Sequence, residues 1–213
     1  AEKGLIVIAD AKRNDIGSTA ACYSKAFLGN TDLNGNALRA FPADYLTVNG
    51  YLGTDGIQPF AQDCSERNKG IFVLVKTSNP SSGELQNLLL ENGLPVYEYM
   101  GGLVEKWGES TVGRYGYSAV GAVVGATHPE EAARLRKVLP HTFFLIPGYG
   151  AQGANAQMLK CCFKEDGLGG VVNNSRGILC AYKKNGGSYF DAARAAAVAM
   201  QKDLSEVIGR MGK

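Results

Sequence analysis

Short apolar runs rich in β-branched residues recur along the chain and alternate with segments of helical patterning. The apolar runs are residues 5–9, 45–48, 71–75, 119–124, 143–146 and 169–172. The segments with helical patterning include residues 18–27, 85–90 and 129–138. In residues 190–207, apolar side chains from Phe190 to Val207 recur at three-to-four spacing and predict an amphipathic closing helix whose stripe packs on the core. The alternation predicts βα units around a parallel sheet.

Every predicted strand is followed by polar or glycine-rich residues. These ends are residues 10–12, 49–51, 76–79, 125–127, 147–150 and 173–177. In a (β/α) barrel the loops after the strands share one rim, which carries the active site, and the last two loops hold a phosphate. A doubly wound sheet is the weaker alternative because no GxGxxG motif opens a helix. We therefore expect an α/β fold of the barrel type, with residues 1–213 in a single domain.

Composition excludes several classes of function. With 213 residues, of which 45% are hydrophobic and 20% charged, the chain can bury one sizeable core. A net charge of +2 without a long basic run gives no support for a nucleic-acid or membrane-surface partner. Five cysteines without metal-ligand spacing disfavour both a disulfide framework and a zinc site, which fits a cytoplasmic location. No apolar run is long enough for a transmembrane helix.

Two acids flank one lysine directly after the first predicted strand. Asp10 and Lys12 are two residues apart and therefore point the same way, and Asp15 follows in the loop. Carboxyl ends of parallel strands are where α/β folds place their chemistry, so this motif predicts a catalytic centre. A surface ion-pair cluster is the alternative. Because the lysine neutralises the charge that a magnesium ion would need, we expect proton transfer by Lys12 and no metal.

Three further loops carry groups that suit a phosphorylated substrate. Residues 147–154 form a glycine-rich loop with the amide of Gln152, and residues 174–177 contain Arg176, whose guanidinium can contact a phosphate through two hydrogen bonds. Residues 76–80 offer hydroxyl and amide groups for the polar edge of a heterocycle or sugar. Tight βα connections and a turn before proline are the structural alternatives for these loops.

Four ordered motifs together resemble one family. Residues 10–19 (DAKRNDIGST), 77–80 (TSNP), 147–153 (PGYGAQG) and 175–178 (SRGI) resemble orotidine 5'-phosphate decarboxylase in its longer bacterial form. The resemblance implies a homodimeric TIM barrel that converts orotidine 5'-monophosphate (OMP) into UMP and carbon dioxide in pyrimidine biosynthesis. It also implies that the small-molecule nucleotide is processed without a metal or an organic cofactor.

The resemblance assigns catalytic roles to the first motif. The residue matching Asp10 lies against the departing carboxylate, and the residue matching Lys12 delivers a proton to the pyrimidine carbon that loses it. The residues matching Asp15, Ile16 and Thr19 reach into the site of the neighbouring subunit. An acid on either side favours the ammonium form of a lysine, which is consistent with Lys12 as proton donor.

The resemblance also assigns the binding residues. Ser78 matches the residue that hydrogen-bonds the pyrimidine edge, and Gln152 matches the amide of a closing loop that bridges base and phosphate. Arg176, with the backbone of Ser175, matches the group that grips the phosphate.

The chain departs from the family at its start. Two further strands of the family, which carry a ribose-binding aspartate and a second active-site lysine, do not match any segment here. We therefore expect a (β/α)8 TIM barrel with about six of the eight strands represented, as part of a longer polypeptide. Two alternatives stay open: an inactive nucleotide-binding fragment, and a magnesium-dependent sugar-phosphate decarboxylase or aldolase of the same barrel type. The Ile16–Thr19 continuation and the Gln152 loop argue against the sugar-phosphate enzyme.

Overall fold

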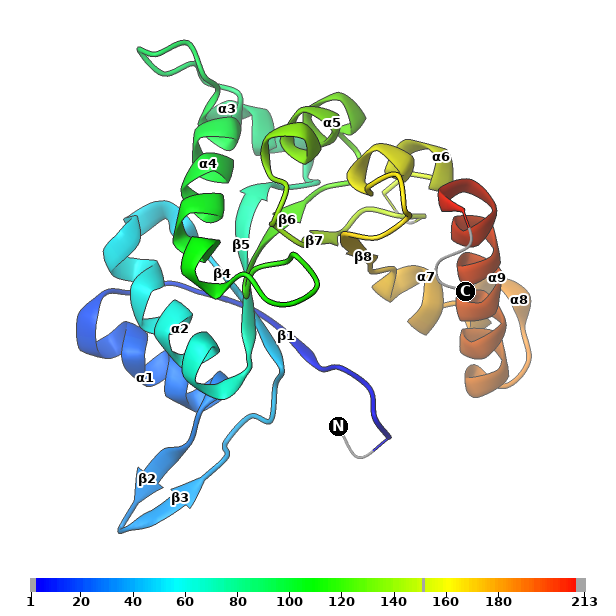
Figure 1. Cartoon of the computed structure of the whole chain (residues 1–213). Helices are drawn as coiled ribbons and strands as arrows, with labels where there is room; N and C mark the ends of the chain where they lie inside the picture. The colour runs from blue at the N-terminus through cyan, green and yellow to red at the C-terminus, as the bar shows by residue number, and fades with distance from the viewer. Residues whose placement is uncertain (1–2, 151, 210–213) are drawn as a thin grey trace.

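A six-stranded parallel sheet forms the centre of the computed structural model, which describes residues 3–150 and 152–209. The strand order is β1-β4-β5-β6-β7-β8, and each neighbouring pair is parallel. The strands are β1 (Ile8–Arg13), β4 (Tyr45–Val48), β5 (Gly70–Lys76), β6 (Val120–Val124), β7 (Phe144–Ile146) and β8 (Gly170–Val172). The sheet curls as an open part of a (β/α)8 barrel, with six strands as predicted (Figure 1).

Helices between the strands, such as α2, α4 and α5, cover the outer face of the sheet, and further helices follow the last strand (Figure 1). The α-helices of the described residues are α1 (Gly17–Leu28), α2 (Thr54–Arg67), α3 (Gly83–Gln86), α4 (Val96–Gly108), α5 (Pro129–Val138), α6 (Ala156–Leu159), α7 (Ser175–Leu179), α8 (Tyr182–Asn185) and α9 (Tyr189–Ile208). An exposed antiparallel hairpin of β2 (Thr31–Leu33) and β3 (Asn36–Leu38) projects from the connection between α1 and β4. Within the described residues, no helix combines the length and apolar character that a membrane span requires.

Side chains of the strands build two apolar layers. On β5, Ile71, Val73 and Val75 point outward and pack between the sheet and the helices. Phe72 points to the inner side of the curl, where it forms a second cluster with Val123 and other residues. The alternation follows from the two-residue period of a strand. The inner cluster lies on the inner side of the curled sheet, beneath the loops that follow the strands.

The first strand differs from its prediction. Leu5 and Ile6 are 72% and 70% exposed and precede β1, which begins at Ile8 and continues through Arg13. In the described sheet β1 is an edge strand that pairs only with β4, so the apolar residues that precede it are not covered on both faces. Asp10 and Lys12 therefore lie within the strand, not after it.

The other five predicted strands are confirmed to within one residue at each end. The helix expected at residues 85–90 is wrong, because α3 ends at Gln86. Beyond α3 the chain turns back on itself and Leu89 pairs with Pro95 in an isolated bridge. The closing helix is confirmed as α9, but its stripe is only partly right. Met200 is buried, whereas Phe190 is 79% exposed because it lies in the first turn, at the end of the packed face.

Candidate active site

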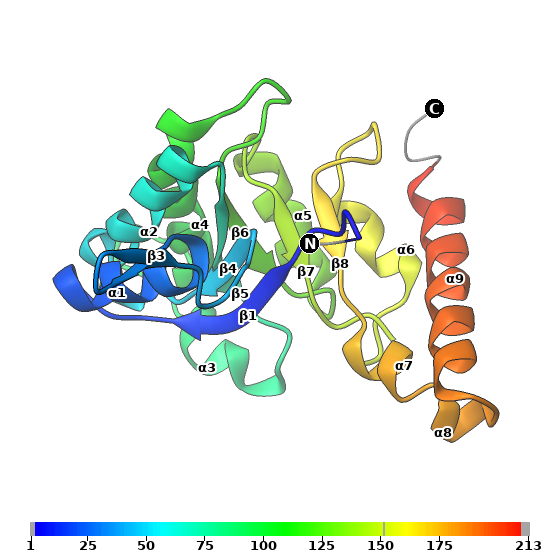
Figure 2. The same cartoon turned by 90° about the horizontal axis from the view of Figure 1, so that it is seen from below.

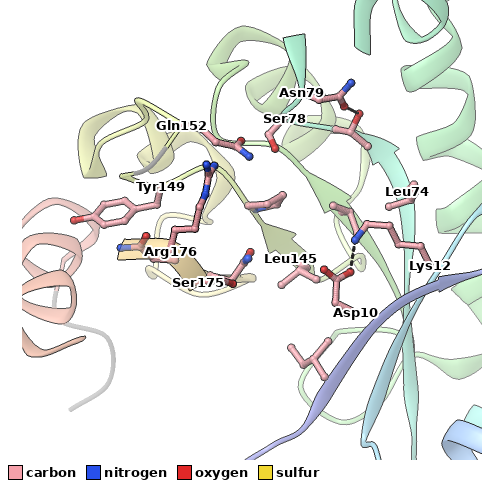
Figure 3. A pocket seen from close by; sticks show the side chains of 17 residues that line it. Asp10, Lys12, Leu74, Ser78, Asn79, Leu145, Tyr149, Gln152, Ser175 and Arg176 are labelled. Atoms are coloured by element: carbon pink, nitrogen blue, oxygen red, sulfur yellow. Dashed lines mark hydrogen bonds and ion pairs between the residues drawn. The ribbon is translucent and has the colours of Figure 1, made fainter. Parts of the chain in front are cut away.

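A cavity of about 680 Å³ opens at the carboxyl ends of the strands. Its floor is apolar and includes Ile8, Leu74, Val123 and Leu145, which belong to or pack on the inner cluster of the barrel. Polar residues after β5, β7 and β8 surround this floor, together with two charged residues of β1. Figure 3 shows these two charged residues at one end of the cavity and Gln152 and Arg176 at the other. The cavity can therefore accommodate an elongated polar ligand over an apolar base.

Asp10 and Lys12 form an ion pair at one end of the cavity. Lys12 Nζ donates a hydrogen bond to Asp10 Oδ1 over 2.6 Å, and both side chains are more than half exposed. Lys12 has a φ of +48°, and the register of β1 on β4 shifts between Ala9 and Arg13. A side chain with positive φ is uncommon outside glycine, and such strained positions cluster at functional sites. The irregular strand carries both side chains to the rim of the cavity.

Thr47, a fully buried residue of β4, forms hydrogen bonds with both residues of this ion pair. Its hydroxyl oxygen accepts a hydrogen bond from the backbone N–H of Lys12 over 2.9 Å. The same hydroxyl donates to Asp10 Oδ1 over 3.0 Å. Thr47 is not among the predicted site residues, although a hydroxyl inside the apolar run 45–48 is a usable signal. One buried side chain thus fixes the backbone of the cation and the carboxylate of the acid.

Asp15, Ile16 and Thr19 do not line the cavity of their own chain. Asp15 Oδ1 accepts a hydrogen bond from the N–H of Ile16 over 2.8 Å, next to the start of α1. Ile16 is 54% exposed, and Thr19 is also exposed. Among the described residues, the acid paired with Lys12 is Asp10 and not Asp15. The expectation of a lysine flanked by two acids is therefore met on only one side within this chain.

Residues after β6 and a residue of α3 hold the Ser78 loop. Thr127 Oγ1, after β6, donates a hydrogen bond to the Ser78 carbonyl over 3.1 Å. Gly125 lies so close that a Cβ at this position would sit 2.8 Å from the backbone N and Cα of Ser78. Gln86 accepts from the N–H of Thr77 over 2.9 Å. These contacts hold Ser78 at the cavity wall.

A buried lysine lies behind the Ser78 loop, outside the cavity. Lys76 Nζ donates to Asn87 Oδ1 over 2.7 Å and lies over the ring of Tyr97. Burial lowers the pKa of Lys76, and Glu131 opposes this shift. Burial also lowers the pKa of His128, and the charge of Lys76 adds to that effect. The low pKa values follow from the cost of placing positive charge in a weakly solvated region.

Gln152, Ser175 and Arg176 lie at the end of the cavity opposite Lys12 (Figure 3). Gln152 belongs to the glycine-rich loop after β7, of which Ala151 lies outside the described residues. Ser175 and Arg176 are the first residues of α7, whose start is capped by the Asn174 side chain, which accepts from the Gly177 N–H over 3.1 Å. The structure thus brings one amide and one guanidinium together, a combination suited to a phosphate.

The rim joins an ion-paired lysine, an apolar floor and a polar end that suits an anion. This arrangement is that of a (β/α) barrel, a class in which the loops after the last strands frequently form a phosphate-binding site. Residues 1–185 match the Orotidine 5'-phosphate decarboxylase / HUMPS family, and the chain belongs to this family.

Individual relatives agree with the family match. The chain is 51% identical over 181 residues to an orotidine 5'-phosphate decarboxylase of Caldicellulosiruptor bescii. The aligned residues cover 85% of this chain and 59% of the relative. The chain is 44% identical over 210 residues to the protein of the same name from Rhodopirellula baltica, covering 95% and 68%. The structure of Leishmania donovani OMP decarboxylase superposes with a TM-score of 0.74 at 31% identity, covering 96% of this chain and 69% of the other. The chain thus spans 59% of the length of the Caldicellulosiruptor relative.

Proposed function

We propose that the polypeptide carrying this sequence decarboxylates orotidine 5'-monophosphate to UMP in pyrimidine biosynthesis. The observation that carries this proposal is the placement of the Lys12–Asp10 ion pair at one end of the cavity and of Arg176 at the other. Family membership and relatives named orotidine 5'-phosphate decarboxylase support the choice of substrate.

The proposed chemistry takes place at Asp10 and Lys12. The bond between the pyrimidine ring and its carboxylate breaks, carbon dioxide leaves, and the electron pair stays on the ring carbon. The ammonium group of Lys12 stabilises this developing negative charge and then transfers a proton to the carbon. Asp10 lies against the substrate carboxylate, so its repulsion is relieved only as carbon dioxide forms. We propose that these steps need neither a metal nor an organic cofactor.

The opposite end of the cavity is proposed to bind the nucleotide. Arg176 and the backbone of Ser175 would bind the phosphate, Gln152 would bridge phosphate and base, and Ser78 would hydrogen-bond the pyrimidine edge. Contacts with the phosphate lie far from the reacting carbon and provide binding energy that orients the base over Lys12.

We also propose that the active form is a homodimer in which Asp15, Ile16 and Thr19 reach the neighbouring site. The exposure of Ile16 and the position of all three residues outside their own cavity support this arrangement. Mixing Lys12→Ala and Asp15→Asn proteins tests it, because a mixed dimer would contain one site with neither substitution. We expect turnover to reappear on mixing, and a mixture as inactive as its components would contradict shared sites.

Two smaller proposals concern the chain as a whole. We propose that residues 1–213 belong to one barrel domain, because a single sheet runs from β1 to β8. We place the reaction in the cytoplasm, which the five free cysteine thiols support.

The test of the function is decarboxylation by the intact natural polypeptide that carries this sequence. Loss of the ultraviolet absorbance of OMP reports turnover. The intact mass establishes which polypeptide is present in the assay. Addition of a chelator tests whether turnover needs a metal. We expect turnover that the chelator does not change. Chelator-sensitive activity on a 3-keto-gulonate 6-phosphate would instead favour the magnesium-dependent alternative. Tight binding of UMP without turnover would favour the inactive nucleotide-binding alternative.

A further inference from the structure

We propose that Asp203 of α9 is a positioning residue for the phosphate-binding loop and acts through Tyr149. This inference rests on the proposed function, because it assigns a task to a contact behind the phosphate end of the same cavity.

The contact joins the cavity to the last helix of the described chain. Tyr149 lines the cavity, and its hydroxyl donates a hydrogen bond to Asp203 Oδ2 over 2.5 Å. Figure 3 shows the phenol directed away from the cavity, towards the helix at its edge. Burial and the neighbouring Asp203 carboxylate raise the pKa of Tyr149 to about 12, so the hydroxyl keeps the proton that it donates. A hydrogen bond to a charged acceptor is stronger than one between neutral groups.

The loop around Tyr149 contains glycines on both sides of the tyrosine, and a fixed side chain restricts its conformations. Gly148 and Gly150 flank Tyr149 with φ values of +110° and +71°, so the backbone on both sides adopts conformations that favour glycine. The Gly150 N–H donates to the Ala154 carbonyl over 2.8 Å, which closes a tight turn just after the tyrosine. Glycine-rich backbone has many conformations to lose when a ligand binds. A fixed Tyr149 side chain reduces that cost because the loop is already ordered.

Helix α9 contacts both sides of the phosphate end. It packs against α7, whose first residues are Ser175 and Arg176, and against α6, which follows the Tyr149 loop. Figure 2 shows α9 alongside α6 and α7 at the edge of the barrel. Helix α9 therefore packs against the helix that begins with Ser175 and Arg176, and its Asp203 is bonded to the glycine-rich loop. Loss of the Asp203 contact is expected to weaken mainly ligands that carry a phosphate, and to leave the contact of Ser78 with the base unchanged.

The experiment removes either partner of the hydrogen bond and compares ligands with and without the phosphate. Asp203→Ala removes the acceptor and Tyr149→Phe removes the donor, each in the intact natural polypeptide. Binding of UMP and of uridine is measured by titration, and kcat and KM are measured with OMP. We expect each variant to weaken UMP about ten-fold and to raise KM similarly, while uridine affinity and kcat change little. The double variant should be no weaker than the single variants, because both remove the same bond.

Glu206→Ala is the matched control, since it removes an exposed acid from the same helix. We expect it to bind both ligands like the wild type. Equal weakening of UMP and uridine, unchanged UMP binding in both single variants, or additive losses in the double variant would overturn the role of Asp203. If Asp203→Ala does not fold, the comparison of UMP with uridine in Tyr149→Phe decides. A wild-type polypeptide that does not bind UMP would instead contradict the proposed function itself.

Discussion

Lys12 Nζ lies 2.6 Å from Asp10 Oδ1, and the hydroxyl of Thr47 contacts the same Asp10 oxygen and the backbone N–H of Lys12. The ion pair is more than half exposed, whereas the threonine beneath it is fully buried. Exposed ion pairs contribute little to stability, and buried hydroxyls that satisfy a backbone N–H contribute more. We therefore expect changes to the ion pair to affect mainly turnover, and changes to Thr47 to affect stability as well.

Asp10→Asn should affect turnover far more than folding. The variant loses the charge that we propose to face the substrate carboxylate, and we expect OMP turnover to fall roughly a hundred-fold or more. Its free energy of unfolding should change by less than about 1 kcal/mol because the ion pair is exposed. Steady-state kinetics and urea unfolding measure the two effects. A large loss of stability with unchanged turnover would show that the pair is structural.

Thr47→Val should change both properties. The substitution keeps the shape of the side chain but leaves the Lys12 N–H without its acceptor, at a cost of about 1–3 kcal/mol in unfolding free energy. Asp10 also loses a donor, so we expect kcat to fall, whereas UMP affinity should be retained because the phosphate is proposed to bind at the other end of the cavity. Thr47→Ser is the control, because it preserves the hydroxyl and should restore most of kcat. Equal loss of kcat in both variants would exclude a role for the hydroxyl.

Gly125→Ala should displace Ser78. The new Cβ would lie 2.8 Å from two backbone atoms of Ser78, so the loop must move, and we expect a stability loss of about 1–3 kcal/mol with weaker UMP binding. Gly102→Ala is the matched control, because no atom lies within 4 Å of its Cβ position on α4. The control should be neutral or more stable by roughly 0.5–1 kcal/mol. Isothermal titration with UMP and thermal unfolding compare the two, and unchanged UMP affinity in Gly125→Ala would be inconsistent with this account.

The contacts of Asp44 just before β1 should make the stability of the protein depend on pH. Its carboxylate accepts a hydrogen bond from the Val7 N–H over 2.9 Å and one from Lys69 Nζ over 2.9 Å. These contacts lower the pKa of Asp44 below the ordinary value of 3.8. Stability from a lowered pKa is fully present above the unfolded-state value and is lost as the pH falls through the folded-state value.

Asp44→Asn removes this titration. We expect the variant to be less stable than the wild type at pH 7, and the difference to shrink only below pH 3.8. Solvent screening of the partly exposed carboxylate limits the effect to about 1 kcal/mol or less. Urea unfolding across the pH range provides the measurement. A difference that disappears between pH 7 and pH 5 would point to another group.

The sequence predicts the later strands well because each is a short apolar run bounded by polar or glycine residues. It fails at residues 5–9, since an apolar run does not reveal whether a neighbouring strand covers it. Asp10 and Lys12 were found from local spacing, and their pairing follows from the strand period. Thr47 and Asp203 were missed because their contacts cross 35 or more residues of chain, and no local pattern encodes such a contact.

The most direct test of the account is the turnover of OMP by Lys12→Ala, measured in the intact natural polypeptide together with UMP binding. Lys12 is the proposed proton donor, whereas Gln152 and Arg176 are proposed to bind the phosphate. We therefore expect turnover to fall roughly a thousand-fold or more while UMP affinity stays close to that of the wild type. A variant that decarboxylates OMP at a rate near that of the wild type would contradict Lys12 as the proton donor.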